Sequence, residues 1–278
     1  MIVVTGATGN VGRPLVEALA AAGEEVVAVS RREAGELPAG VTHRRGDLAD
    51  VDGLEGLFEG AGAVYLLVAG LGHDLRPREI VAAAVARGVR RIVLQSSQLV
   101  GTRPESVSHA PLRACEEAVR GSGLEWTVLR PGGFASNAFL WAERVRSART
   151  VAAPFADVAL PVVDPADIAE VAAAALRGPA HAGRTYVLTG PVAVTPREQV
   201  RALAEAVGAP VGFVALGAGE ARERMVRFLP EEAVDGMLSV MGDPGEEERR
   251  VSPDVERVLG RAPRPFSAWA ERHAGAFA

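Results

Sequence analysis

The 278-residue sequence predicts an α/β fold built on a doubly wound parallel sheet, and three observations lead to this prediction. Short runs of β-branched and other apolar residues alternate with helical segments over the first 130 residues. A glycine-rich turn directly follows the first of these runs. Strand and helix patterns continue after about residue 190, where they predict a smaller C-terminal α/β substrate domain. Such alternation is typical of a parallel sheet with helices on both faces.

Composition narrows the classes of function. The net charge is −5 without a basic block, which speaks against nucleic-acid binding. Cys115 is the only cysteine, so no intrachain disulfide can form. No apolar run approaches the ~18–20 residues of a membrane span, and the histidines show no metal-ligand spacing. We expect a cytoplasmic monomer or homodimer that binds a small-molecule substrate and no metal, nucleic acid or membrane.

The first strand, Met1–Val4, leads into a glycine-rich turn and then a helix. Gly6 permits a tight turn, Gly9 lets the backbone approach a diphosphate, and Gly12 lets the helix pack close to the strand. The free N–H groups that begin the helix then bind the phosphates. A glycine turn without a ligand is the alternative, but the order strand, turn, helix favours a Rossmann-type nucleotide site. Its predicted residues are Thr5, Gly6, Thr8, Gly9, Asn10, Val11 and Gly12.

The second strand, Glu25–Ser30, is followed by Arg31 and Arg32. In a dinucleotide fold this position faces the adenosine ribose, where an acid binds the 2′-hydroxyl and an arginine accommodates a 2′-phosphate. Ser30 stands where the acid would be, and guanidinium pairs well with phosphate, so the sequence predicts NADP(H) in preference to NAD(H). Glu33 lies close and weakens this preference. Two solvated arginines in a loop are the alternative.

A third strand over Val41–Leu48 ends in Asp47 and Leu48. Asp47 can accept a hydrogen bond from the adenine amino group while Leu48 covers the ring. Asp47 can equally cap the helix predicted over 49–58, and the two roles are compatible.

The fourth strand, Ala61–Val68, is strongly apolar, and Ala69 and Gly70 after it are small enough for close approach to a cofactor. A helix over 76–88 follows, and then a fifth strand over 91–95. Ligands of parallel sheets bind at the carboxyl ends of the strands, where these turns lie.

A helix over about 110–120 precedes the sixth strand, 125–130. The chain here resembles NmrA-like atypical short-chain dehydrogenases/reductases. The stretches that show the resemblance are TGATGNVG (5–12), EEAVRGSGLEWTVLRPGGF (116–134), VVDPADIAEVAAAAL (162–176) and YVLTGPVAVTPREQVRALAEAVGAPVGFV (186–214). The resemblance implies that residues 1–135, with about 163–189, bind NADP, and that about 136–162 and 190–278 form the smaller substrate-binding or lid domain.

The resemblance also implies residues on the nicotinamide side. In that family the loop after Arg-Pro lines the nicotinamide and the substrate, and the fifth strand ends at an active-site serine. The corresponding residues of this chain are Ser96 or Ser97, Pro131, Gly132 and Phe134 for the cofactor, and Phe134 and Asn137 for the substrate. For Ser96 and Ser97, a cap on the following segment is an equally good interpretation.

The chain departs from the family pattern at one position. Where short-chain dehydrogenases have Tyr-x-x-x-Lys, it has His109 and Arg113, and its two tyrosines, Tyr65 and Tyr186, fall in predicted strands. Arg113 can bond ribose hydroxyls but cannot shuttle protons, because it stays charged. His109 titrates near neutral pH and could donate a proton. A surface or capping role for His109 is the alternative.

Hydride transfer without that tyrosine favours acceptors whose product anion is stabilised, such as quinones. We therefore expect an NADPH-dependent reductase that transfers hydride to a quinone-like or conjugated carbonyl compound, for example in natural-product tailoring. A non-catalytic NADP(H)-sensing regulatory protein of the NmrA type is the alternative. The helical stretch 220–241 contains Met225 and Phe228, which could line a bulky apolar substrate pocket or belong to the core.

Overall fold

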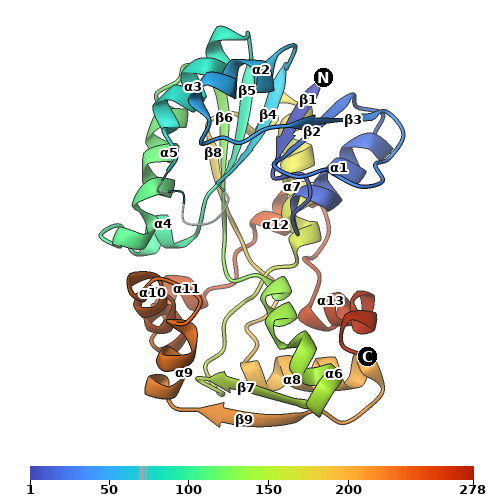
Figure 1. The fold of residues 1–278 in the computed structure, drawn as a ribbon, viewed down its shortest axis with the longest axis vertical. Helices are drawn as coiled ribbons and strands as arrows, with labels where there is room; N and C mark the ends of the chain where they lie inside the picture. The colour runs from blue at the N-terminus through green and yellow to red at the C-terminus, as the bar shows by residue number, and fades with distance from the viewer. Residues whose placement is uncertain (69–71, 73) are drawn as a thin grey trace.

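The computed structural model describes residues 1–68, 72 and 74–278, so the predicted contacts of Ala69 and Gly70 lie outside the described residues. The main sheet has seven parallel strands in the order β3-β2-β1-β4-β5-β6-β8 (Figure 1). The strand order reverses at β1, as in other doubly wound sheets, so the predicted Rossmann-type fold is confirmed. The strands are β1 (Ile2–Thr5), β2 (Val26–Ser30), β3 (Val41–Arg45), β4 (Ala63–Leu67), β5 (Arg91–Gln95), β6 (Glu125–Pro131) and β8 (Arg184–Leu188).

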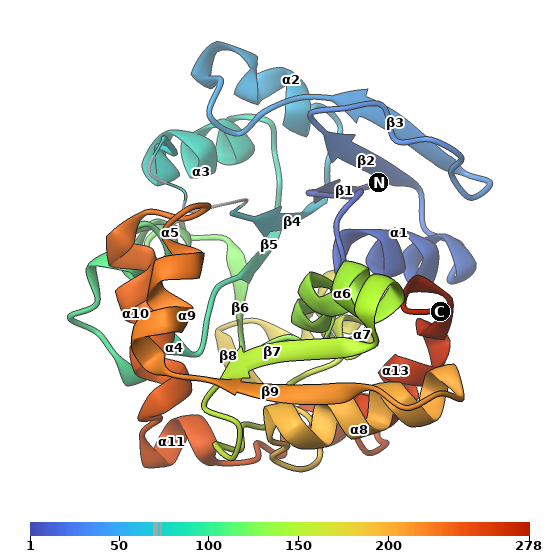
Figure 2. The ribbon, with the colours of Figure 1, turned by 60° about the horizontal axis from the view of Figure 1, so that its bottom comes forward.

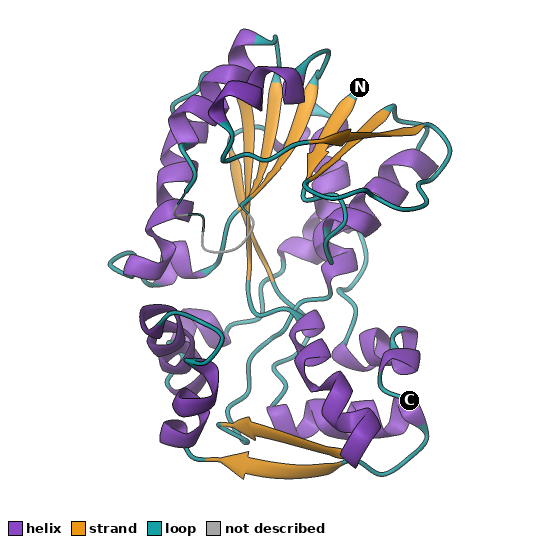
Figure 3. Ribbon diagram, in the orientation of Figure 1, coloured by secondary structure: helices purple, strands orange, loops and turns teal. Residues whose placement is uncertain are grey.

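Helices cover both faces of this sheet (Figure 3). Val4 of β1 packs in a core with α1 and α7, while its neighbour Val3 packs in a second core with α2, α3 and α5. Successive side chains of a strand point to opposite faces, so a strand buried on both faces must be apolar over consecutive positions. The helices are α1 (Gly12–Ala21) and α7 (Pro165–Arg177) on one face, and α2 (Leu54–Phe58), α3 (Pro77–Ala86) and α5 (Ala110–Arg120) on the other.

A smaller unit lies beyond the carboxyl ends of the sheet. Its two parallel strands, β7 (Thr150–Pro154) and β9 (Gly212–Leu216), pack with α6 and α8 (Figure 2). Trp269 is 1% exposed in this third core and meets the ring of Phe139 edge-on at 4.9 Å between centroids. The helices near this unit are η3 (Ala135–Trp141), α6 (Ala142–Ala148), α8 (Pro196–Val207), α13 (Phe266–Arg272) and η5 (Ala274–Ala276).

The predicted helical stretch 220–241 is two helices, α9 (Ala218–Met225) and α10 (Glu231–Gly242). Pro230 is the N-cap of α10, and a proline cannot continue a preceding helix because it lacks an N–H. Among the described residues, no helix has the length and apolar character needed to cross a membrane. The remaining helices are η1 (Val51–Gly53), α4 (Leu99–Thr102), η2 (Val107–His109), η4 (Pro179–His181), α11 (Glu246–Arg249) and α12 (Asp254–Leu259).

Ion pairs tie the C-terminal segment to α7. Asp167 is fully buried and accepts hydrogen bonds from Arg261 (2.7 Å) and from both the backbone and the guanidinium of Arg264. Glu170 pairs with the same two arginines at 2.6 and 2.5 Å. Burial alone would raise the pKa of Glu170, but these hydrogen bonds and charges hold it below its ordinary value. The smaller unit is thus fixed to the sheet by charged side chains as well as by apolar packing.

Candidate cofactor and substrate site

The turn between β1 and α1 has a shape that only glycine permits. Gly6 has a left-handed φ of +65°. A Cβ on Gly12 would lie 2.1 Å from the Gly6 carbonyl oxygen and 2.8 Å from the Ala7 Cα, so any side chain would displace the turn. The N-cap of α1, Val11, has no capping side chain, and no acidic residue occupies the first turn. The first turn of α1 therefore contributes no carboxylate or capping side chain that would compete with a diphosphate for its N–H groups.

Two of the predicted residues in this turn have protein partners. The Thr5 hydroxyl donates to the Tyr65 carbonyl (3.0 Å) and accepts from the Leu67 N–H (2.9 Å), which ties β1 to β4. The Asn10 amide donates to the Ser136 hydroxyl at 3.2 Å and so links the glycine turn to η3.

A cavity of about 620 Å³ extends from the glycine turn to the ends of β2 and β3, and we call it the nucleotide cavity. The Gly46 N–H bonds the Ser30 carbonyl at 3.1 Å, which brings the turn after β3 beside the end of β2. The Asp47 carboxylate also accepts from the Ala49 N–H at 3.1 Å, but this bond lies in a turn. The helix predicted over 49–58 is instead η1 (Val51–Gly53) followed by α2 (Leu54–Phe58), so the predicted helix cap by Asp47 is wrong. The lining residues are Thr5, Gly6, Thr8, Gly9, Val29, Ser30, Arg31, Gly46, Asp47, Leu48, Ala49, Leu67, Gly72, Asp74 and Leu75.

This cavity has the form that a dinucleotide needs. It extends from the glycine turn that precedes α1 to Arg31, which is exposed. Arg32 is also exposed. These residues fit the adenosine and diphosphate parts of a nicotinamide cofactor.

The serines after β5 are bonded to protein groups. Ser96 is 6% exposed, and its hydroxyl donates to Glu116 at 2.6 Å. Arg130 binds the same carboxylate with two N–H groups, at 2.9 and 2.7 Å. Burial would raise the pKa of Glu116, but the hydrogen bonds from Arg130 and Ser96 hold it below its ordinary value. The Ser97 hydroxyl accepts from the Leu99 N–H at 3.2 Å, which is the predicted capping role.

The loop after β6 lies between the main sheet and the smaller unit. The Gly132 N–H bonds the Leu188 carbonyl at 2.9 Å, and Pro131 pairs with the same residue as the last position of β6. Phe134 packs against the first core and bridges to Val163. Asn137 is exposed on η3.

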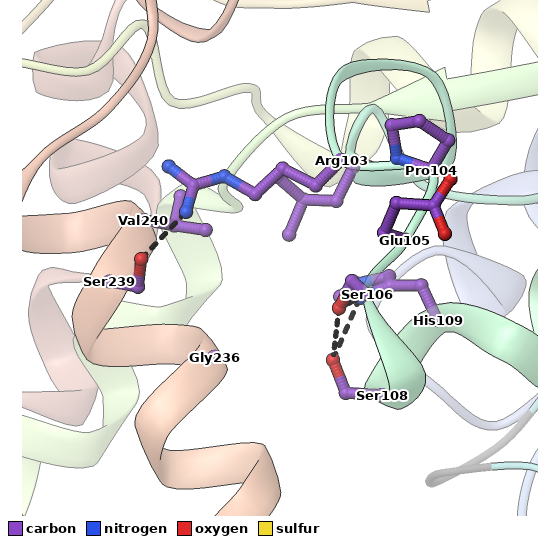
Figure 4. Close-up of a pocket in the computed structure, with 10 residues that line it drawn as sticks. Arg103, Pro104, Glu105, Ser106, Ser108, His109, Gly236, Ser239 and Val240 are labelled. Atoms are coloured by element: carbon purple, nitrogen blue, oxygen red, sulfur yellow. Dashed lines mark hydrogen bonds between the residues drawn. The ribbon is translucent and has the colours of Figure 1, made fainter.

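His109 and Arg113 stand at the N-terminus of α5. The ring Nδ1 of His109 is 3.0 Å from the Ser108 hydroxyl and 3.4 Å from that of Ser106 (Figure 4). Arg113 donates to the Ser106 carbonyl at 2.7 Å. Burial, and then the charge of Arg113, lower the pKa of His109 below its ordinary value, so the ring is neutral at pH 7.

A second cavity, of about 390 Å³, lies between this loop and α10 (Figure 4), and we call it the His109 cavity. Its residues are Leu99, Arg103, Pro104, Glu105, Ser106, Ser108, His109, Gly236, Ser239 and Val240. The α10 residues and the two serines were not predicted from the sequence. Met225 and Phe228 do not line this cavity, and Phe228 is 86% exposed at the turn between α9 and α10.

Arg103 holds α10 and α11 against the segment after α4. Its guanidinium binds the Glu248 carboxylate at 2.7 and 2.8 Å and donates to the Ser239 hydroxyl at 2.7 Å. Glu248 is 3% exposed and also accepts from Thr102 (2.9 Å). Burial would raise the pKa of Glu248, but the hydrogen bonds from Arg103 and the Gly245 backbone hold it below its ordinary value. One wall of the His109 cavity therefore depends on this ion pair.

Comparison with known proteins identifies the family. Residues 6–179 match the model of a protein family described as NAD(P)H-binding. The chain belongs to this NAD(P)H-binding family. The expected nicotinamide cofactor and the predicted NAD(P)-binding family are thus confirmed. Among the described residues, no cluster of three or more His, Cys, Asp or Glu side chains could hold a metal ion.

Relatives of this NAD(P)H-binding chain include reductases of similar length. The chain is 38% identical to a (4-alkanoyl-5-oxo-2,5-dihydrofuran-3-yl)methyl phosphate reductase of Streptomyces griseus, over 100% of this chain and 99% of the relative. It is 31% identical to an NAD(P)H azoreductase of Xenophilus azovorans, over the same shares. The crystal structure of an NADPH-dependent quinone oxidoreductase from Escherichia coli shares the fold, with a TM-score of 0.79, 23% identity and coverage of 98% and 99%.

Proposed function

We propose that this protein is an NADPH-dependent reductase that transfers hydride to a small conjugated acceptor, such as a quinone or an unsaturated lactone or ketone. The observation that supports this most directly is the placement of two cavities around the N-terminus of α5. Gly72 of the nucleotide cavity lies against Pro111, since a Cβ on Gly72 would be 3.2 Å from the Pro111 Cβ. His109, two residues earlier, lines the other cavity. When bound, NADPH supplies the hydride and its two electrons.

In this proposal each cavity has its own task. Residues 1–135, with about 163–189, bind and orient the cofactor through the glycine turn and Arg31. About 136–162 and 190–278 contribute to the acceptor side, where α10 provides one wall of the His109 cavity. The α5 N-terminus favours negative charge that develops on the acceptor there.

The relatives' substrates support the acceptor class. A 4-alkanoyl-5-oxo-2,5-dihydrofuran has a ring C=C conjugated to carbonyl groups, and an azo compound has an N=N conjugated to arenes. Both are electron-poor π systems, as quinones are. Hydride addition to such systems leaves a delocalised anion, which solvent or a weak acid can protonate.

The titratable residues near α5 suit hydride transfer to a conjugated acceptor better than oxidation of an alcohol, which needs a general base at the hydroxyl. No Tyr-x-x-x-Lys pair occurs on α5, and the Tyr65 hydroxyl is buried and bonded to Gln95. Burial raises the pKa of Tyr65 far above its ordinary value. Its hydroxyl therefore stays protonated at neutral pH and cannot act as a general base. A neutral His109 can donate a hydrogen bond to the acceptor oxygen, and Arg113 can hold the positive charge that stabilises the product anion.

The test is turnover with a panel of acceptors. Purified protein is first titrated with NADPH and NADH by fluorescence, and NADPH oxidation is then followed with menadione, an acyl-substituted butenolide and an azo dye. We expect oxidation with at least one of these acceptors and none in the reverse direction with NADP⁺ and a simple secondary alcohol. Tight NADPH binding with no oxidation by any acceptor would contradict the proposal and favour the NADP(H)-sensing regulator.

A further inference from the structure

The end of β2 is tied to β3 by a short chain of hydrogen bonds. Ser30 is 7% exposed, and its hydroxyl lies 2.6 Å from the Arg32 carbonyl oxygen and 2.9 Å from Nε2 of His43. His43 belongs to β3, its side chain is 17% exposed, and its backbone position pairs with Ala28 rather than with Ser30. The side chain therefore reaches along the sheet edge to the tip of β2.

The direction of each hydrogen bond follows from the donors available. A hydroxyl has one hydrogen, and a carbonyl oxygen can only accept, so the Ser30 hydrogen points to Arg32. The hydroxyl must then accept from His43, and Nε2 of His43 carries a hydrogen. This chain from His43 through Ser30 to the Arg32 carbonyl fixes the backbone on both sides of Arg31. Arg31 is the arginine of this turn that lines the nucleotide cavity.

The other ring nitrogen of His43 faces the acid of the same turn. Its Nδ1 is 3.8 Å from a carboxylate oxygen of Glu33, whose side chain is 90% exposed. Glu33 does not line the nucleotide cavity. The two charged side chains of this turn therefore lie on different sides. Arg31 lines the nucleotide cavity, and Glu33 lies beside His43. A carboxylate on the cofactor side would repel a 2′-phosphate and favour the ribose hydroxyl.

We infer that His43 is a positioning residue for cofactor choice, which acts through Ser30 to aim Arg31 at the 2′-phosphate of NADPH. This inference rests on the proposed use of NADPH. It assigns a selectivity role to a β3 side chain that does not line the nucleotide cavity.

The experiment compares His43→Leu, which removes the donor, with His43→Gln, whose amide can place an N–H near the position of Nε2. Dissociation constants for NADPH and NADH are measured by fluorescence titration, and melting temperatures are recorded for every variant. A hydrogen bond of ordinary strength predicts that His43→Leu weakens NADPH binding about fivefold and leaves NADH within about twofold. His43→Gln should restore most of the selectivity. In an Arg31→Ala background, His43→Leu should cause no further loss of NADPH affinity.

Several outcomes contradict the inference. Equal losses for NADPH and NADH in His43→Leu would show a merely structural role, and so would a full additional loss in the Arg31→Ala background. Should His43→Leu fail to fold, Ser30→Ala breaks the same chain with a smaller change and must shift selectivity in the same direction. A wild type that binds NADPH and NADH equally would overturn the proposed cofactor as well. A wild type that prefers NADPH, with His43→Leu unchanged, would overturn the inference alone.

Discussion

The glycine turn of the nucleotide cavity and the α10–α11 wall of the His109 cavity are held in place by different forces. The turn sits on β1, whose residues are all buried, and its shape is set by backbone contacts such as Gly12 against the Gly6 carbonyl. The wall depends on Arg103 and Glu248, which are far apart in the sequence, and it leaves Met237 41% exposed. We therefore expect substitutions in the glycine turn to be poorly tolerated. Residues of the α10–α11 wall can change without altering the nucleotide cavity.

Gly12→Val tests the rigid side of this comparison and should have the largest effect. The new side chain would overlap the Gly6 carbonyl and displace the turn from the α1 N-terminus. We expect NADPH affinity to fall about 100-fold or more in a fluorescence titration, because the phosphates lose their backbone donors. Gly56→Ala is the control, since a Cβ there meets nothing within 4 Å. NADPH binding at wild-type strength by Gly12→Val would contradict the placement of the diphosphate.

Arg31→Ala tests whether the nucleotide cavity distinguishes NADPH from NADH through this one side chain. Removing a charge-assisted bidentate contact is expected to cost about 2 kcal/mol, or about 30-fold in NADPH affinity. NADH affinity should change by less than about threefold, because NADH has no 2′-phosphate. Arg201→Ala, an exposed arginine on α8, is the matched control. Equal losses of affinity for NADPH and NADH would show that Arg31 does not bind the 2′-phosphate.

Glu248→Gln breaks the wall of the other cavity. It leaves the Arg103 guanidinium without its charged partner in a partly buried position, which we expect to lower the free energy of unfolding by about 2 kcal/mol in urea titrations. The acceptor KM should rise severalfold while NADPH affinity stays constant, because the nucleotide cavity shares no wall with α10. Glu246→Gln, at an exposed carboxylate on the same helix, should change neither quantity. A parallel loss of NADPH affinity would mean that the two ends are not independent.

The same ion pair predicts a pH dependence of stability. Because the pKa of Glu248 is lowered in the folded chain, its ionised form stabilises the fold above the unfolded pKa of about 4.3. This stabilisation is lost as pH falls through the folded pKa. The difference in unfolding free energy between wild type and Glu248→Gln should therefore be constant from about pH 8 to pH 5 and shrink below about pH 4. A difference that grows on acidification would contradict the assignment.

Much of the cofactor end was predictable because its signals are local. The turn needs glycines at fixed spacing after a buried strand, and both features lie within twelve consecutive residues. Ser96 shows the limit of this approach, since its bond to Glu116 is made across 20 residues. The Arg103–Glu248 pair joins side chains 145 residues apart, and nothing in the sequence near either one marks the other. The break at Pro230 was available as a signal, because proline ends a helix.

His109→Gln is the smallest expected effect and tests whether the acceptor end takes part in the chemistry. Glutamine can keep one hydrogen bond to the Ser108 hydroxyl but cannot titrate. Because the product anion of a conjugated acceptor is also protonated by solvent, we expect the loss in kcat to be only about fivefold, the worth of one hydrogen bond. Steady-state kinetics with menadione at saturating NADPH would measure it, with NADPH affinity as the internal control. A loss of 1000-fold would identify His109 as an obligatory general acid, and the acceptor end would then be as intolerant of change as the glycine turn.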